Sequence, residues 1–211
     1  MRYPIVFFDL DGTIMKTDEG VTNAYAYAAE KLGRTDIPIG DTELYMGPSI
    51  DSVCKKIGYD EELTREFVLA MREYYVAKGI NQCRPYEGVI ELMHELKDKG
   101  CDVYICTAKP VASARKIEAK FGFGDIVLAG SEGVNIDKPE ILRAFLQKLG
   151  VDPSQCAMIG DRYTDLLGGR QNNTHTVGVL YGYGPREELE SCAPDYIAQT
   201  VAQLREWLLG E

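Results

Sequence analysis

The stretch Ile5-Val6-Phe7-Phe8-Asp9-Leu10-Asp11-Gly12-Thr13 places two acids directly after a short, continuous apolar run. A run of this length, ended by acids and a glycine, is typical of a β-strand that is buried on both faces. Similar runs recur along the chain, each followed by a turn signal. We therefore expect strands over residues 5–10, 102–107, 126–129, 156–159 and 176–180, with a short edge strand over 195–198.

Longer amphipathic patterns separate these runs. They predict helices over residues 88–99, 111–121, 139–149, 165–171 and 202–209. Gly100, Gly122 and Gly150 stand where helix ends favour glycine. Alternation of short apolar strands with amphipathic helices indicates an α/β fold. The predicted core is Rossmann-like, with three layers (α/β/α) built around a parallel sheet.

The spacing of the first two strands indicates an insertion. The first strand ends near residue 10 and the second begins near residue 102, which is far more than one helical crossover needs. Most of the surplus has helical periodicity, over residues 20–32, 50–57 and 61–78. We therefore expect an inserted α-helical cap domain at 16–82, on a core formed by residues 1–15 and 83–211.

The composition excludes several classes of protein. With 45% hydrophobic and 27% charged residues, the chain is not of the disordered type. Its formal net charge of −10 makes it a poor binder of nucleic-acid polymers, whose phosphates are held by Lys and Arg. No stretch approaches the roughly 20 apolar residues of a membrane span, and no signal peptide is recognisable. Six scattered cysteines without a CxxC motif indicate buried thiols and a cytoplasmic location.

Polar residues gather just after the predicted strands. In a doubly wound sheet the ligand lies beyond the carboxyl ends of the strands, so these residues are expected at one rim. Singly, each has an ordinary structural explanation as a turn, a helix cap or a solvated helix start. Together, several carboxylates at one edge would repel one another, and a hard divalent cation such as Mg²⁺ resolves this. The residues concerned are Asp9, Asp11, Thr107, Ala108, Lys138, Asp161 and Asp165.

In chain order these groups resemble the motifs of the haloacid dehalogenase-like superfamily: DxDGT at 9–13, Thr107, Lys138, and GDxxxD at 160–165. The resemblance covers essentially the whole chain, including the helical insertion after the first motif. The segments 106–110, 160–162 and 179–184 look like the phosphoglycolate phosphatase and 5′-nucleotidase branch. The chain departs from that branch at one place, where Lys16-Thr17 stand in the position of the branch's common Asp-Ser. This difference bears on cap docking or substrate choice and not on the catalytic chemistry.

The resemblance implies a role for each catalytic residue. Asp9 would be the nucleophile that forms an aspartyl-phosphate, which divides hydrolysis into two transfers. Asp11 would protonate the leaving oxygen and then activate the hydrolytic water. Thr107 and the backbone N–H of Ala108 would bind phosphate oxygens, and Lys138 would neutralise negative charge on the nucleophile and the phosphoryl group.

The resemblance also implies a Mg²⁺ cofactor. Asp9, the backbone carbonyl of Asp11, and Asp161 would hold the ion, with Asp165 as a further ligand or as support. The ligand chemistry agrees, because these donors are all oxygen atoms and the chain has only two histidines. The cysteines are scattered, so a zinc site is not expected.

The predicted function is Mg²⁺-dependent hydrolysis of small phosphomonoesters, with phosphoglycolate and nucleoside monophosphates as candidates. Within the superfamily, Asp11 argues against a haloacid dehalogenase or a phosphonate hydrolase, while a sugar-phosphate phosphomutase remains an alternative. From another class, a receiver-like phospho-acceptor module also uses acids and a lysine, but it leaves the DxDGT motif and the cap unexplained. A monomer and a homodimer are both compatible with the sequence.

The cap offers fewer signals. Residues 45–49 are expected to form a turn between cap helices, either as a substrate-facing loop like that of the branch or as a plain connector. Tyr25, Tyr27, Tyr74 and Tyr75 are expected to pack inside the cap and not to form a base-stacking platform.

Overall fold

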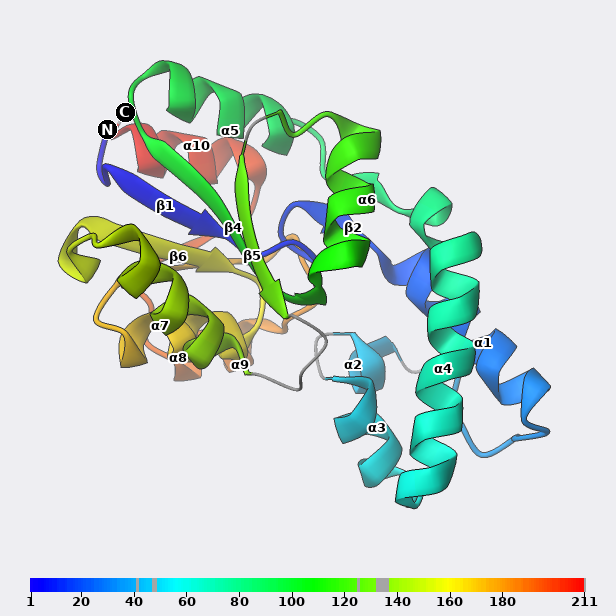
Figure 1. The fold of residues 1–211 in the computed structure, drawn as a ribbon. Helices are drawn as coiled ribbons and strands as arrows, with labels where there is room; N and C mark the ends of the chain where they lie inside the picture. The colour runs from blue at the N-terminus through cyan, green and yellow to red at the C-terminus, as the bar shows by residue number, and fades with distance from the viewer. Residues whose placement is uncertain (41, 47–48, 125, 132–136, 211) are drawn as a thin grey trace. The chain divides into compact units, whose positions relative to one another are not determined.

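The computed structural model describes residues 1–211 except 41, 47–48, 125, 132–136 and 211, and it divides into two compact units (Figure 1). The first unit comprises residues 1–15 and 85–211, and the second comprises residues 16–84. The observed second unit thus ends at 84, where the sequence analysis placed its end at 82. Two paired strands of two residues each, β2 (Met15–Lys16) and β3 (Arg84–Pro85), carry the chain between the units.

The first unit is built on a six-stranded sheet with the order β5-β4-β1-β6-β7-β8. Every strand pair in it is parallel, which confirms the predicted α/β class. The strands are β1 (Ile5–Phe8), β4 (Asp102–Pro110), β5 (Val127–Ser131), β6 (Cys156–Gly160), β7 (His175–Val179) and β8 (Tyr196–Ala198).

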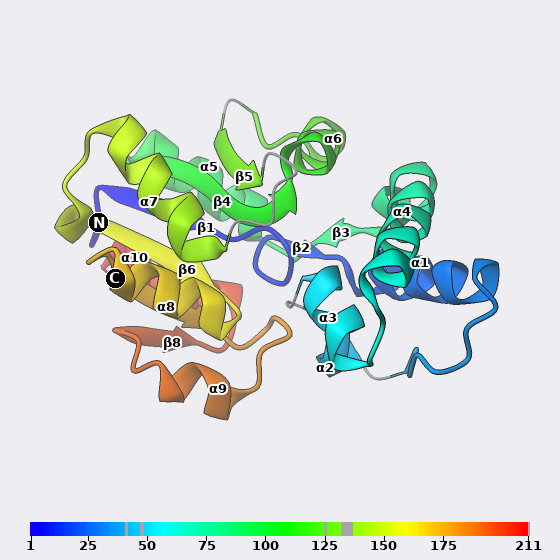
Figure 2. The ribbon, with the colours of Figure 1, turned by 60° about the horizontal axis from the view of Figure 1, so that its bottom comes forward.

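Helices cover both faces of this sheet. Figures 1 and 2 show α7 and α8 on one face and α5 and α10 on the other, which is the expected three-layer arrangement. The helices of this unit are α5 (Val89–Asp98), α6 (Val111–Phe121), α7 (Lys138–Leu149), α8 (Tyr163–Gln171), α9 (Arg186–Ser191) and α10 (Val201–Leu209), and η2 (Pro153–Gln155) is a 3₁₀ turn. Gly122 and Gly150 cap α6 and α7 in the left-handed conformation, as the sequence predicts.

Strand β1 occupies the centre of the sheet, and all four of its residues are buried. On one face Phe7 contacts Tyr104 and Phe145, within a cluster that includes the apolar side of α7. After β1 the chain adds β4 and β5 on one side, and it later adds β6, β7 and β8 on the other. The strand order therefore reverses at β1, and its carboxyl end is where a doubly wound sheet places its ligand.

The second unit is helical: α1 (Asp18–Lys31), α2 (Thr42–Tyr45), α3 (Ile50–Lys56), α4 (Glu61–Ala77) and the 3₁₀ turn η1 (Gly79–Gln82). Its interior is aromatic, because Tyr25 stacks on Tyr45 at 4.5 Å between ring centroids and also contacts Phe67. Tyr27 packs against Tyr74, and Tyr75 is buried. The expectation of packing inside the unit is confirmed for Tyr25 and Tyr75, while Tyr27 and Tyr74 pack on each other and stay partly exposed.

Several local features differ from the expectation. Tyr45 ends helix α2 and is only 3% exposed, so it packs in the unit's interior and is not part of a turn. Its hydroxyl lies 3.2 Å from the Thr22 hydroxyl, and Ser49 caps α3 by accepting a bond from the Ser52 N–H. Residues 47–48 of the expected turn lie outside the described residues. Helix α9 was not predicted, because a six-residue helix is too short to show periodicity.

All six cysteines are free and buried, as expected. Burial raises the pKa of the Cys106 thiol to about 12 and that of Cys54 to about 11, which makes these thiols poor nucleophiles. None of the helices that the structure describes has both the length and the apolar character needed to cross a bilayer.

Candidate active site

Three carboxylates meet at the carboxyl ends of the central strands. Phe8 pairs in register with Ile159, so the residues that follow, Asp9 after β1 and Asp161 after β6, emerge side by side. The N–H of Asp9 donates to the Ile159 carbonyl at 2.9 Å. Asp165, in the first turn of α8, turns back toward them, and one carboxylate oxygen from each of the three acids lies within 4.8 Å of the others. All three side chains are buried.

A single buried lysine contacts two of these acids. Lys138 begins helix α7 and is only 5% exposed, so it is not the solvated helix start that its position beside Pro139 also suggests. Its ammonium donates to Asp9, lies 2.7 Å from Asp165, and donates to the Cys106 carbonyl at 3.2 Å. The lysine therefore links β1, β4 and α8 at one point.

Asp161 is oriented by two donors that the sequence analysis did not identify. The Thr13 hydroxyl donates to one carboxylate oxygen at 3.1 Å, and the backbone N–H of Tyr183 donates to the other at 2.8 Å. Thr13 belongs to DxDGT and Tyr183 to the 179–184 segment, so the motifs marked both positions without indicating these bonds. Gly12 has φ of +87°, and a Cβ there would lie 2.2 Å from the Asp161 carboxylate. Only glycine fits at that position.

The protonation of this cluster reflects its shortage of positive charge. Burial raises the pKa of Asp9 to about 7. The charge of Lys138 lowers this pKa, and the charge of Asp165 raises it further. Burial also raises the pKa of Asp161, with Asp165 and Asp9 adding to the effect. Burial lowers the pKa of Lys138, but Asp165 and Asp9 outweigh it and hold the lysine charged. One ammonium is therefore insufficient for three carboxylates.

These observations fit a divalent cation. The donor set Asp9, Asp161 and Asp165 consists of carboxylate oxygens only, which suits a hard ion such as Mg²⁺. A cation there would offset the repulsion among three buried carboxylates that share one lysine. The cluster could therefore bind a metal ion.

The side chain of Asp11 is held apart from the three acids. Its two oxygens accept from the Lys109 ammonium at 2.9 and 2.8 Å. Lys109 lies in the segment 106–110, and no sequence signal indicates its contact with Asp11. Two lysines thus divide the acids: Lys138 contacts Asp9 and Asp165, and Lys109 contacts Asp11.

The expected phosphate-binding residues follow the same edge of the sheet. Thr107 is 1% exposed, and its hydroxyl accepts from the Lys109 N–H at 3.1 Å, so the proton of that hydroxyl points elsewhere. Thr107 directly follows Cys106, whose carbonyl binds Lys138. Thr107 and Ala108 are thus the two residues of β4 that follow the carbonyl contacted by Lys138.

We expect Gly184→Ala to damage this site. A Cβ at Gly184 would lie 1.9 Å from the Asp161 backbone oxygen, so the loop must move, and the Tyr183 N–H bond to Asp161 would be lost. The expected result is an affinity for a divalent cation such as Mg²⁺ that is lower by about 10-fold or more in a calorimetric titration, because a lost hydrogen bond to a charged group costs roughly 1.5–3 kcal/mol. Gly40→Ala is the control, since nothing lies within 4 Å of its Cβ position. Equal effects of both substitutions would contradict this account of the loop.

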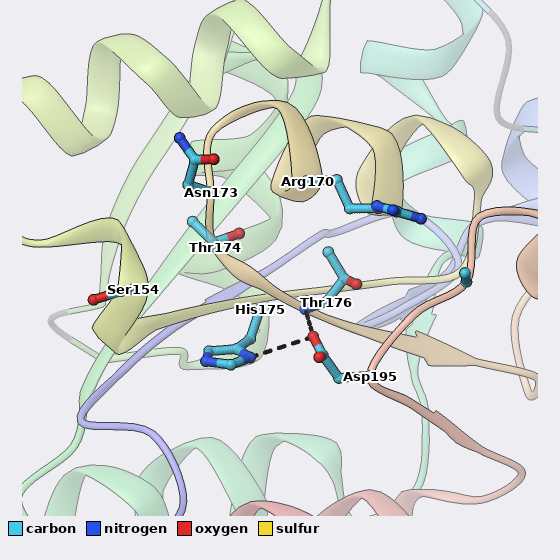
Figure 3. Close-up of a pocket in the computed structure, with 8 residues that line it drawn as sticks. Ser154, Arg170, Asn173, Thr174, His175, Thr176 and Asp195 are labelled. Atoms are coloured by element: carbon cyan, nitrogen blue, oxygen red, sulfur yellow. Dashed lines mark hydrogen bonds and ion pairs between the residues drawn. The ribbon is translucent and has the colours of Figure 1, made fainter.

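A concave region lies elsewhere on the first unit. An open pocket of about 440 Å³ lies near the start of β7, lined by Arg170, His175 and Asp195 among others. Figure 3 shows these side chains. Asp195 accepts from the Thr176 N–H at 2.8 Å and lies 3.4 Å from His175, and Arg170 donates to the Cys192 carbonyl. Asp195 thus pairs with two other lining residues, and the pocket lies at the amino end of β7, away from the acids.

Comparison with known proteins agrees with the geometry. A family model for haloacid dehalogenase-like hydrolases matches residues 3–173. The chain is 35% identical over 213 residues to a 5′-nucleotidase from Pseudomonas aeruginosa, covering 99% of this chain and 96% of that protein. It is 29% identical over 208 residues to the pyrophosphatase PpaX from Bacillus cereus, covering 97% and 95%. The crystal structure of a predicted phosphatase from Clostridium acetobutylicum matches with a TM-score of 0.91 at 30% identity, covering 100% of both chains.

The chain therefore belongs to the haloacid dehalogenase-like hydrolase family. The resemblance drawn from its motifs is confirmed, and so is the enzyme class expected from them, a phosphoric monoester hydrolase.

Proposed function

We propose that this protein is a Mg²⁺-dependent phosphatase that hydrolyses small phosphomonoesters through a phosphorylated Asp9. The observation that carries the proposal is the buried cluster of Asp9, Asp161 and Asp165, with Lys138 bound to it, at the switch point of the sheet. A phosphoryl group brought to this cluster would meet a nucleophilic carboxylate, an ammonium and a cation site together.

In the first step a carboxylate oxygen of Asp9 attacks phosphorus, and the bond from phosphorus to the ester oxygen breaks. Asp11, in its protonated form, gives its proton to the departing oxygen, so the product leaves as a neutral alcohol. Lys138 holds the Asp9 carboxylate in place and keeps its positive charge beside the developing negative charge. The Thr107 hydroxyl and the Ala108 N–H would bind the phosphoryl oxygens.

In the second step Asp11, now a carboxylate, removes a proton from water, which attacks phosphorus. The bond from phosphorus to Asp9 breaks, and inorganic phosphate leaves. Asp161 and Asp165, with Asp9, are the residues that would hold Mg²⁺, and the bound ion would supply positive charge to the phosphoryl oxygens. Thr13 and Tyr183 keep Asp161 oriented for that purpose.

The helical unit of residues 16–84 is proposed to be the cap that selects the substrate. The resemblance of the chain to a 5′-nucleotidase supports nucleoside monophosphates as candidates, and phosphoglycolate is proposed from the motif resemblance. A cap of this size favours small phosphomonoesters over folded phosphoproteins. The protein is proposed to act in the cytoplasm, as a monomer or a homodimer.

A panel of phosphate compounds tests the substrate class. Phosphate release would be measured with Mg²⁺ for nucleoside monophosphates, phosphoglycolate, pyrophosphate, a sugar phosphate and a folded phosphoprotein. We expect the highest kcat/KM for a small phosphomonoester. A folded phosphoprotein as the best substrate would contradict the proposal, and transfer of phosphate between positions of a sugar, without release, would identify a phosphomutase instead.

Exchange of the cap tests its role in selection. Residues 16–84 would be replaced by the corresponding segment of the Pseudomonas aeruginosa 5′-nucleotidase, with the joints placed in β2 and β3. We expect the ranking of substrates to follow the donor of the cap, while turnover of p-nitrophenyl phosphate, which needs few contacts, changes little. A ranking that stays with the core would show that residues 16–84 do not select the substrate.

A further inference from the structure

The contact between Lys109 and Asp11 has the geometry of a positioning device. The Lys109 ammonium donates to both oxygens of Asp11, at 2.9 and 2.8 Å, so the carboxylate is fixed in rotation as well as in place. The Lys109 side chain is 9% exposed and that of Asp11 is 28% exposed. A nearly buried ammonium on a half-buried carboxylate is more constraining than a surface ion pair.

The backbone of Lys109 is itself fixed. Its N–H donates to the Thr107 hydroxyl at 3.1 Å, within the last residues of β4. On the neighbouring strand, Gly130 allows the backbones to approach closely, because a Cβ there would lie 2.8 Å from the Lys109 carbonyl oxygen. The pairing of β4 with β5 is irregular between Cys106 and Pro110, and this irregularity contains Lys109. The Lys109 backbone is therefore held by its bond to Thr107 and by its close approach to Gly130.

The contact also separates Asp11 from the other acids. The carboxylate oxygens of Asp9, Asp161 and Asp165 gather within 4.8 Å of one another, and among the described acids that group does not include Asp11. Only one residue, Leu10, separates Asp11 from Asp9 along the chain. A carboxylate so near a cation site would be drawn to the cation unless another positive group held it.

We propose that Lys109 is a positioning residue that holds the Asp11 carboxylate on the leaving-group side and away from the acidic cluster. This inference rests on the proposed function, in which Asp11 is the acid and base. When one oxygen of Asp11 binds a proton or meets the leaving group, the other oxygen keeps its bond to Lys109, so the orientation survives both half-reactions. The lysine thereby keeps Asp11 available for proton transfer.

The leaving group of the substrate provides the test. General-acid help matters for alkyl phosphates, whose leaving oxygen is strongly basic, and hardly matters for p-nitrophenyl phosphate. In Lys109→Met, which keeps the length of the side chain without its charge, we expect kcat/KM to fall by roughly 10–100-fold for alkyl phosphates and by less than about 3-fold for p-nitrophenyl phosphate. Lys109→Arg should recover much of the loss. The control Lys99→Met, at a lysine whose side chain is 49% exposed, should change neither value.

A double-mutant cycle separates action through Asp11 from action on the substrate. If Lys109 works through Asp11, then Lys109→Met should cause no further loss in the Asp11→Asn background. If the two losses multiply, or if Lys109→Met lowers kcat/KM equally for every leaving group, Lys109 acts on the substrate directly and the proposal is overturned. If Lys109→Met does not fold, Lys109→Gln and Lys109→Arg give the same comparison.

The outcome for Asp11 itself distinguishes the two proposals. If Asp11 is the general acid, kcat/KM of Asp11→Asn should depend more steeply on the leaving group than kcat/KM of the wild type does. An equal dependence in the two proteins would overturn the role of Asp11 and, with it, the role of Lys109. A steep dependence in Asp11→Asn, together with a flat one in Lys109→Met, would leave the proposed function standing and overturn only the inference about Lys109.

Discussion

Replacing Asp9 with asparagine is expected to lower kcat by roughly 10⁴-fold or more, because an amide of the same shape cannot attack phosphorus. The substitution keeps the volume of the side chain at the buried end of β1, so the fold should be retained. Circular dichroism and gel filtration would establish this, and phosphate release would measure the loss. Asp102→Asn, at an exposed acid that begins β4, is the control and should retain full activity. Substantial turnover by a folded, pure Asp9→Asn sample would contradict the assignment of the nucleophile.

The same variant tests the electrostatics of the cluster. Burial raises the pKa of Asp9 from 3.8 to about 7, so the metal-free protein is most stable below about pH 4 with respect to this group and loses that stability as the pH rises through 7. Asparagine carries no charge, and the metal-free variant should therefore have the higher Tm at pH 8. The Tm should rise by roughly 2–4 °C for each kcal/mol added to the free energy of unfolding. The difference in Tm between the variant and the wild type should shrink as the pH falls toward 4. A lower Tm than the wild type at pH 8 would show that the bond to Lys138 outweighs the cost of burial.

Removal of divalent cations is expected to abolish activity. Chelation followed by gel filtration should lower phosphate release by about 10³-fold or more, because the charge stabilisation lost is worth several kcal/mol and about 1.4 kcal/mol corresponds to a factor of ten. Mg²⁺ should restore activity. Ca²⁺ should not, since it takes more oxygen ligands at longer distances and would displace the Asp9 carboxylate from its reactive position. Full activity in excess chelator would contradict the proposed metal site.

A stability measurement shows whether the ion binds at the expected residues. Mg²⁺ should raise the Tm of the wild type, because a ligand that binds only the folded state stabilises it. The increase should be lost in Asp161→Asn, since Asp161 is one of the three clustered acids. Glu190→Gln, in an exposed ion pair with Arg186, should keep the increase. An equal increase in all three proteins would mean that Mg²⁺ binds elsewhere.

The sequence predicted the core more completely than its connections. Helix α6 was expected at 111–121 and is found at Val111–Phe121, because an amphipathic pattern ended by Gly122 fixes both its face and its end. Strand β4 was expected to stop at 107 but continues to Pro110, which pairs with Ser131 beyond an irregular register. Such pairing depends on the neighbouring strand, and hydrophobic periodicity carries no information about it. The two-residue strands β2 and β3 are likewise too short to leave a pattern.

The acidic cluster was predictable for a geometric reason. In a parallel sheet, residues that follow neighbouring strands emerge together, and this places Asp9 beside Asp161. The contacts that orient these acids were not predictable. The reach of Lys109 to Asp11 depends on its backbone bond to Thr107 and on the close approach of Gly130. The Tyr183 N–H reaches Asp161 because Gly182 and Gly184 leave space for the loop. Backbone placement after a strand end is set by such tertiary contacts.

The most direct test of the account is chemical trapping of the phosphorylated enzyme. The Asp11→Asn variant would be mixed with p-nitrophenyl phosphate and Mg²⁺, quenched, reduced with borohydride and analysed by peptide mass spectrometry. The good leaving group needs no acid, while hydrolysis lacks its base, so the acyl phosphate should accumulate. We predict a burst of p-nitrophenol and conversion of Asp9 to homoserine, the product of reducing an acyl phosphate. A burst with reduction at a different acid, or with Asp9 unmodified, would contradict the claim that Asp9 carries the phosphoryl group.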